Sequence, residues 1–145
     1  MRTPKDITVA FVRFVPEKLV ELTLYVSMEF ATASHLCFCG CGNKVVTPLS
    51  PTDWQLYFDG RTVSLTPSVG SWDFPCRSHY WIRKSQVHWA ASWTGEQVAD
   101  AARLDDEAKR RYFAEAGDGR TGERKVAGAV GKPSLLARLR RWFGV

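Results

Sequence analysis

Four cysteines and one histidine form the most specific chemical pattern in the chain. Cys37, Cys39 and Cys41 occupy alternate positions, and Cys76 and His79 follow much later in the sequence. Thiolate and imidazole are ligands that zinc prefers, and four of them complete a tetrahedral site. The pattern therefore predicts one structural zinc ion, with five candidate ligands for four positions.

The first three cysteines cannot reach one ion from an extended strand, because Cys37 and Cys41 would then be about 13 Å apart. Gly40 and Gly42 allow a tight turn, since glycine tolerates a positive φ. We expect a zinc knuckle that presents two of the three sulfurs to the metal. Cys39 and Cys41, each followed by a glycine, are slightly favoured, whereas Cys37 is either a ligand or a buried thiol.

Disulfide bonding or scattered reduced thiols are the alternatives to metal binding. Only one of the three clustered cysteines could pair with Cys76. The other two would form a strained short loop or stay free, since a disulfide needs Cα atoms about 4.4–6.8 Å apart. The polar residues 1–6 and the alternating apolar residues after them do not resemble a secretory signal. We therefore expect a cytoplasmic location, where cysteines bind metals or catalyse more often than they form bridges.

Two enzymatic alternatives use the same residues. A catalytic zinc needs an open coordination position and a nearby carboxylate; Asp73 and Glu29 are near in sequence, but their spacing matches no hydrolase or deaminase pattern. Cys76 and His79 could instead act as a nucleophile and its base. A closed structural site is favoured over both alternatives, and no catalytic residue is predicted.

The remaining histidines and most tryptophans are interpreted as structural. His35 and His88 are isolated, although His35 is near enough to the knuckle to be a reserve ligand. Five tryptophans fall in or beside β-like segments, and most of them are expected in the core. They are Trp54, Trp72, Trp81, Trp89 and Trp93.

The residues around these positions have the pattern of a small β domain. Strand-like segments cover 7–15, 19–28 and 45–47. Two hairpins are predicted, one joining 54–58 to 62–65 around Asp59-Gly60, the other joining 80–82 to 86–89. The fold class is therefore α+β, a mainly antiparallel β domain of zinc-ribbon or treble-clef type around the knuckle.

In the C-terminal part of the chain, the spacing of the apolar residues changes from that of strands to that of a helix, and the charge changes as well. One interrupted helix or two short helices are predicted over 95–115. Together with the β segments they form a predicted zinc-binding domain over 1–116. The glycine-rich residues 117–133 indicate a flexible linker. Residues 134–145 form an amphipathic pattern typical of a short basic tail helix. Its candidate partner-binding residues are Leu135, Arg138, Leu139, Arg141, Trp142 and Phe143.

Charge is concentrated in the tail. Residues 1–119 carry 13 Lys/Arg and 14 Asp/Glu, whereas residues 120–145 carry 7 Lys/Arg and one Glu. A nucleic-acid footprint spread over the folded domain is therefore not supported. The basic tail still allows contacts with a protein, with nucleic acid or with an anionic membrane surface.

Four segments resemble a family of small bacterial proteins whose members look like zinc-binding proteins and have no assigned activity. They are His35–Gly42, Thr47–Trp54, Leu65–Ser68 and Phe74–Ile82. Some members of that family are found beside genes for ubiquitin-like proteins and their activating and conjugating enzymes. The resemblance implies an accessory or ligase-like role in such a conjugation system.

Three hypotheses on function follow, in order of preference. The first is a non-enzymatic structural-zinc module that binds a ubiquitin-like protein or its activating or conjugating enzyme. The second is a nucleic-acid-binding zinc module that uses the basic tail and exposed aromatic residues. The third is a zinc-dependent hydrolase, with the thiol enzyme as its variant. The sequence does not indicate the oligomeric state.

Overall fold

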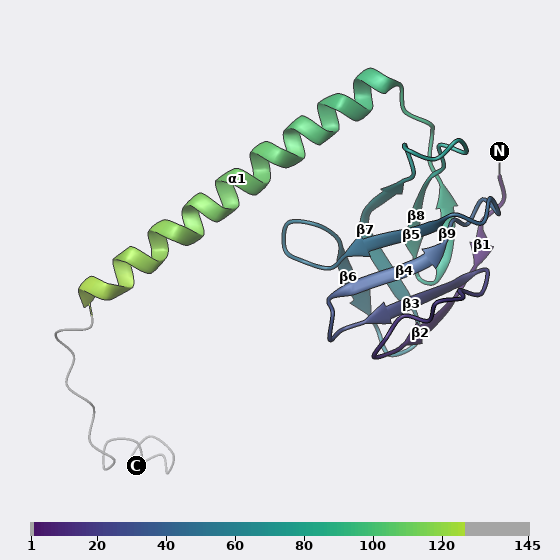
Figure 1. Ribbon diagram of the computed structural model, residues 1–145, viewed down its shortest axis with the longest axis horizontal. Coiled ribbons are helices and arrows are strands. Elements are labelled where there is room, and N and C mark those ends of the chain that lie inside the picture. The colour runs from purple at the N-terminus through teal and green to yellow at the C-terminus, as the bar shows by residue number, and fades with distance from the viewer. Residues whose placement is uncertain (1, 127–145) are drawn as a thin grey trace, which may run out of the picture. The chain divides into compact units, whose positions relative to one another are not determined.

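The computed structural model describes residues 2–126, with side chains described up to residue 117. It confirms the predicted α+β class, with two β-sheets that are mostly antiparallel and one C-terminal helix (Figure 1). Residues up to Asp105 form one compact unit, and the remainder of the helix is described on its own.

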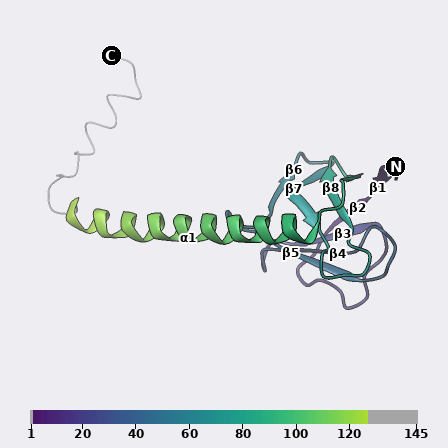
Figure 2. The same ribbon diagram turned by 90° about the horizontal axis from the view of Figure 1, so that it is seen from above.

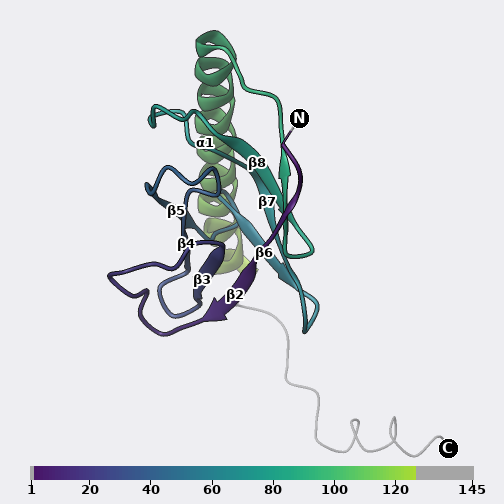
Figure 3. The same cartoon turned by 90° about the vertical axis from the view of Figure 1, so that its right-hand side faces the viewer.

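The larger sheet has five strands in the order β1-β9-β8-β7-β6, and every neighbouring pair is antiparallel. Figure 3 shows β6, β7 and β8 of this sheet to one side of β3, β4 and β5. The strands are β1 (Lys5–Asp6), β6 (Gln55–Phe58), β7 (Val63–Gly70), β8 (His79–Arg83) and β9 (Gln86–Trp89).

The smaller sheet has four strands in the order β2-β3-β4-β5, and only its β2–β3 pair is parallel. The strands are β2 (Thr8–Phe11), β3 (Thr23–Ser27), β4 (Thr32–Leu36) and β5 (Lys44–Pro48). Of the predicted strand over 7–15, only β2 forms, in the smaller sheet, and β1 of the larger sheet directly precedes that range. Ile7 donates its N–H to the Ser85 carbonyl in the β8–β9 turn, whereas Thr8 donates to the Leu22 carbonyl. The N-terminal segment therefore contacts both sheets.

One hydrophobic core lies between the sheets. Strands such as β3, β7 and β8 contribute apolar residues at alternate positions, as expected for sheets with one buried face. β3 contributes Leu24 and Val26, and β8 contributes Tyr80 and Ile82, all of them fully buried. Because Tyr80 and Ile82 face this core, the residues between and beside them on β8 face the opposite side of the larger sheet.

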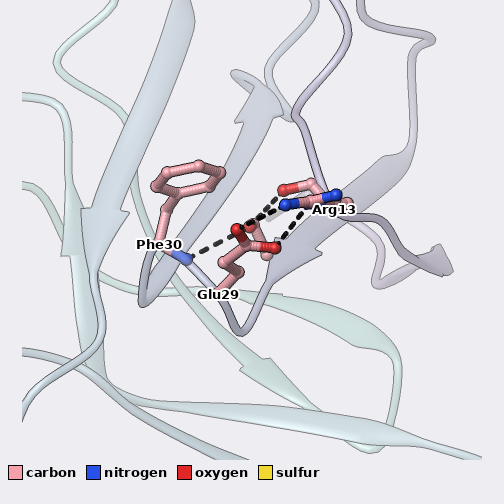
Figure 4. A network of polar contacts seen from close by, with 4 residues as sticks. Arg13, Glu29 and Phe30 are labelled. Carbon is pink, nitrogen blue, oxygen red and sulfur yellow. Dashed lines mark hydrogen bonds and ion pairs between the residues drawn. The ribbon is translucent and has the colours of Figure 1, made fainter.

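The second face of β3 is also buried, which the alternating sequence did not predict. The hydroxyl group of Ser27 donates to the Arg13 carbonyl at 2.6 Å, and the Tyr25 hydroxyl group accepts the Val20 N–H. Arg13 also forms an ion pair with Glu29 on the β3–β4 turn (Figure 4). The β2–β3 loop is thereby held over β3, so polar residues expected in solvent are covered.

Both predicted hairpins are confirmed, but their turns differ. In the β8–β9 hairpin, Arg83 pairs with Gln86, and the two loop residues Lys84 and Ser85 both have positive φ. In the β6–β7 hairpin, Asp59 caps a longer loop by accepting hydrogen bonds from the N–H groups of Arg61 and Thr62. These bonds hold the pKa of the Asp59 carboxyl at about 2.

A single helix, α1 (Gly95–Val126), follows the β domain and is continuous over its length (Figure 2). It begins with a cap in which the Thr94 hydroxyl group accepts the Gln97 N–H. Residues 117–126, expected in the linker, continue the helix. Extending a helix needs no new nucleus, and the Arg, Glu and Lys residues between the glycines are among the better helix formers.

Among the described residues, no helix is long and apolar enough to cross a membrane. The predicted tail helix over 134–145 lies outside the described residues, and so do its candidate partner-binding residues. They are Leu135, Arg138, Leu139, Arg141, Trp142 and Phe143.

Candidate functional site

The predicted knuckle connects β4 to β5. The Asn43 carbonyl accepts the Cys37 N–H at 2.8 Å, and the Cys37 carbonyl accepts the Gly40 N–H at 3.0 Å. Gly40 has a φ of 90° and Gly42 a φ of 78°, values that favour glycine. The chain therefore bends at the predicted positions and gathers the three cysteines.

All four cysteines come together in one cluster, with sulfur atoms within 4.8 Å of one another. The Sγ atoms of Cys37 and Cys39 are 3.5 Å apart, and Cys76 Sγ lies 3.7 Å from Cys41 Sγ and 3.9 Å from Cys37 Sγ. Sulfurs that share a tetrahedral zinc at about 2.3 Å are roughly 3.8 Å apart. None of the four forms a disulfide. This cysteine cluster therefore has the composition and size of a closed metal site.

Burial affects the protonation of one of the four sulfurs, that of Cys37. Cys37 is almost fully buried, and this raises the pKa of its thiol to about 12. The adjacent Tyr80 hydroxyl group lies 4.0 Å from Cys37 Sγ and 2.9 Å from His35 Nε2. Burial also lowers the pKa of His35 to about 3, so this histidine is neutral. A bound metal is what would keep the Cys37 sulfur deprotonated in these surroundings.

His79, the fifth candidate ligand, does not join the cluster. It precedes Tyr80 on β8, and successive side chains of a strand point to opposite faces. Tyr80 points toward the core and Cys37, so His79 points to the other face of the sheet. There its Nε2 lies 2.9 Å from Ser68 Oγ and its Nδ1 lies 2.7 Å from the Ala91 carbonyl oxygen.

These two contacts determine the tautomer of His79. A carbonyl oxygen only accepts hydrogen bonds, so Nδ1 carries the proton and donates it to Ala91. Nε2 of the neutral ring is then an acceptor, and the Ser68 hydroxyl group donates to it. A serine hydroxyl donating to an oriented imidazole is the arrangement of an activated nucleophile.

Ser68 reaches His79 because β7 is irregular at that point. Leu65 pairs with Ile82 and Val69 with Tyr80, so three residues of β7 lie opposite the single residue Trp81. Extra residues of this kind bend a strand and redirect a side chain, and they are frequent beside active sites. The irregularity presents Ser68 on the outer face, next to the first residue of β8.

Two indole rings enclose the His79 side chain. The ring centroids of Trp72 and Trp93 lie 5.0 and 4.9 Å from that of His79, and the two indoles stack on each other at 5.4 Å. The Arg77 guanidinium donates to the carbonyl oxygens of both tryptophans. Only 6% of His79 is exposed, so the imidazole is held in one orientation.

Gly70 makes room for this enclosure. It pairs with His79 across β7 and β8, and a Cβ atom at this position would collide with the Trp72 indole ring. Glycine is therefore required here for a close approach of the indole to the strand.

Residues 71–78 join the cysteine cluster to the Ser68–His79 pair. Ser71 donates its N–H to the Ser78 carbonyl at 2.8 Å, and Arg77 donates to the Phe74 carbonyl at 3.0 Å. This connecting loop carries Trp72 and Arg77 on the side of His79 and Cys76 in the cluster. A metal bound to Cys76 would thus anchor the loop that encloses His79.

The tryptophans differ from the expected core role. Trp54 and Trp89 pack against the core, whereas Trp72 and Trp93 surround His79. Trp81 is partly exposed, with the Arg83 guanidinium 4.7 Å from its ring. His88 pairs with Trp81 across β8 and β9 and is partly buried.

Sequence reasoning did not identify Ser68 as functional. Its polarity is no signal, since β7 also contains Ser64 and Thr66; Ser68 only stands out by following Thr66-Pro67 in one of the segments on which the family resemblance rests. The strand irregularity that turns Ser68 toward His79 has no signature of its own in the sequence.

Comparison with known families gives one match. The family model BubE, described as a bacterial ubiquitination-like system serine protease, matches residues 11–90. The matched region contains the cysteine cluster, Ser68 and His79, and excludes α1. No curated protein and no solved structure matches the chain.

Proposed function

The chain belongs to the BubE family of bacterial ubiquitination-like systems, and from that premise we propose that it is a serine protease with Ser68 as nucleophile and His79 as general base. The observation that carries this proposal is the 2.9 Å contact between Ser68 Oγ and His79 Nε2, with Nδ1 held by a carbonyl oxygen. The family description names the same chemistry. This assignment departs from the non-enzymatic function favoured from the sequence.

The reaction follows from the position of the two side chains. As Ser68 Oγ attacks the substrate carbonyl carbon, its proton passes to His79 Nε2. The bond from that carbon to the leaving nitrogen then breaks, and Nε2 gives the proton to the nitrogen. Water attacks the resulting acyl-serine ester, loses a proton to Nε2, and releases the acid. The proton returns to Ser68, so the enzyme is regenerated.

The carbonyl group of Ala91 performs one of the two tasks of the acid in a Ser-His-Asp triad. It fixes the tautomer and orientation of the ring, but it has no negative charge to stabilise the imidazolium. We therefore expect slower turnover than in a triad with a carboxylate at this position.

We propose that the cysteine cluster holds one structural zinc ion through Cys37, Cys39, Cys41 and Cys76. Four thiolates at these distances favour zinc over harder cations, and they leave no position open for a substrate. The zinc would supply folding free energy and would fix the connecting loop. Four unpaired cysteines also favour a reducing, cytoplasmic compartment.

The substrate and partner are proposed to be proteins of the ubiquitin-like system, either the ubiquitin-like protein or an enzyme that activates or conjugates it. This follows from the family description and not from a feature of the surface. The membrane contact considered from the sequence depends on the tail, and the nucleic-acid contact depends on the tail and on exposed aromatic residues; the tail lies outside the described residues.

Labelling with a fluorophosphonate probe tests the nucleophile without knowledge of the substrate. We expect one adduct per chain, located on Ser68 by mass spectrometry of the digested protein. Ser68→Ala should abolish the adduct, and His79→Gln should slow its formation by about 10²–10⁴-fold. Ser64→Ala is the matched control, since Ser64 lies on the same strand and its hydroxyl group accepts the Lys84 N–H. Equal labelling of Ser68→Ala and the parent would refute the assignment.

A second measurement tests the substrate class. The protein is incubated with the ubiquitin-like protein and its activating and conjugating enzymes, and new termini are identified by mass spectrometry. Cleavage by the parent and by Ser64→Ala, but not by Ser68→Ala, supports the proposal. Labelling of Ser68 without cleavage of any of these proteins would place the substrate outside the system.

A further inference from the structure

Strand β7 continues beyond the end of its neighbour β6. The β6–β7 pairs end with Gln55 and Thr66, whereas β7 itself continues through residues 67–70. The chain ahead of β6 leads away from this part of β7, because Trp54 bridges to Leu49, directly after β5 of the smaller sheet. In the part of the chain that the structure describes, no other strand pairs with residues 67–70 on that side. We call these residues the free edge of β7.

The main chain of the free edge offers hydrogen-bonding groups at alternate residues. Ser71, directly after β7, donates its N–H to the Ser78 carbonyl on the β8 side. Because the N–H and C=O groups of successive residues in a strand point to opposite edges, those of Gly70 and Ser68 point away from β8. Gly70 therefore presents a donor and an acceptor on the side that β6 leaves open.

The nucleophile of the proposed reaction lies on the same free edge. Ser68 Oγ is directed over the outer face of the sheet toward His79, and the Trp72 indole covers that face at Gly70. Pro67 is exposed, and Ser68 is half-buried. With the imidazole and the indole on the outer face, the free edge is the open approach along which a chain can reach Ser68.

We propose that a substrate segment binds the free edge as an added β-strand in line with β6, so that its scissile carbonyl reaches Ser68 Oγ. This inference rests on the proposed function and specifies the substrate: an extended, unfolded stretch of protein that is recognised through its main chain. Residues 67–70 span about 13 Å, which gives room for about four residues of an extended segment. Main-chain hydrogen bonds to an exposed sheet edge are a recurring mode of peptide recognition.

Peptidyl phosphonates test the recognition of the main chain. In acetyl-Ala-Ala-Ala diphenyl phosphonate, phosphorus takes the place of the scissile carbonyl carbon. This compound should label Ser68 faster than the acetyl-Ala compound, which has the same reactive group but is too short to form a strand. N-methylation then removes one N–H at a time. Alternate residues of a strand face its partner, so methylation of the middle alanine should differ from methylation of its two neighbours. We expect labelling to slow about threefold to tenfold where a hydrogen bond is lost and to stay unchanged elsewhere.

Amide hydrogen exchange, measured by NMR on the adducts, locates the added strand. In the unlabelled protein the Gly70 N–H should exchange rapidly, whereas the N–H of Val69, which pairs with Tyr80, should exchange slowly. The tripeptide adduct should slow exchange at Gly70 at least about tenfold, because its N–H becomes paired, and the acetyl-Ala adduct should not. Gly60 in the β6–β7 turn is the matched control, and its exchange should be the same in all three forms.

The outcomes separate this inference from the proposed function. Equal labelling rates of the two phosphonates, equal effects of methylation at all three alanines, or unchanged exchange at Gly70 in the tripeptide adduct would each overturn the added strand and leave the serine protease in place. A parent protein in which neither the phosphonates nor the fluorophosphonate probe label Ser68 would overturn the proposed function and this inference with it. Alternating effects of methylation together with protection of Gly70 would support substrate binding at the free edge.

Discussion

The cysteine cluster and the Ser68–His79 pair are connected by one loop, yet they are built in opposite ways. Three sulfurs of the cluster come from a turn of five residues, 37–41, that glycines bend locally. The serine and the histidine come from two strands and meet through a register shift, and a carbonyl and two indole rings from other segments then hold the ring. Local sequence thus specifies the first site, whereas tertiary structure specifies the second.

This difference predicts that the two sites fail differently. Loss of the cluster should remove a large share of the folding free energy, because the metal would be the main link between the knuckle and the connecting loop. Loss of the Ser68–His79 pair should abolish hydrolysis and leave the protein folded. Both residues lie on the outer face of a sheet whose core is complete without them.

The largest effect is expected for Cys76→Ser. Binding of a structural zinc contributes about 10–16 kcal/mol in small domains, as much as the whole net stability of a typical domain, about 5–15 kcal/mol. We expect the variant to lose its metal and to unfold at least the knuckle and the connecting loop. Elemental analysis and thermal melting of parent and variant check this. A metal-free variant with the melting temperature of the parent would show that the cluster is not a structural metal site.

His79→Gln should give the opposite result, a folded protein that has lost activity. Glutamine can keep a hydrogen bond to Ser68 or to Ala91, but it cannot accept a proton at neutral pH. We expect hydrolysis to fall by about 10²–10⁴-fold, with metal content unchanged and the melting temperature only slightly lowered by the lost hydrogen bond. If His79→Gln loses the metal instead, His79 is a ligand as the sequence suggested, and the two sites are one.

The same contrast explains how far the sequence could be interpreted. The spacing from Cys37 to Cys41, with its two glycines, predicted a knuckle and a cluster that also includes Cys76, because a tight turn is encoded by adjacent residues. His79 was grouped with the cysteines because it follows Cys76 by three positions. Strand β8 begins at His79, and the alternation of side chains along it turns the ring away from the cluster.

The fold shows a similar limit. The β8–β9 hairpin and the start of α1 were predicted from local turn and capping residues. β4 was missed, although it carries His35 into the core. The strand expected over 7–15 is shorter, since only Thr8–Phe11 forms a strand there, and the preceding β1 pairs in the other sheet. The pairing of the strands and its register depend on contacts between segments that are distant in the chain. A single sequence does not show which of these contacts form.

A smaller effect is expected for Gly70→Ala, which leaves both sets of functional side chains in place. The new methyl group would push the Trp72 indole away from His79. Displacement of a catalytic group by about 1 Å can cost up to 10²-fold in rate, so we expect a loss of roughly tenfold with metal retained. Gly95→Ala is the control, because a Cβ there has no neighbour within 4 Å. Equal activity of both variants would show that Trp72 does not position His79.

The smallest effect is expected for Asp59→Ala in the β6–β7 turn, which touches neither site. The variant loses the hydrogen bonds from Arg61 and Thr62 that depress the pKa of this carboxyl to about 2. Because the folded-state pKa lies below the unfolded value, the contribution to stability is complete above about pH 4 and is lost as the pH falls toward 2. At neutral pH we expect a slightly lower melting temperature and unchanged metal content and Ser68 labelling. A change in labelling would mean that the β6–β7 turn and the Ser68–His79 pair are coupled along the outer face of the larger sheet. The catalytic site, as distinct from the local metal site, would then extend to the β6–β7 hairpin.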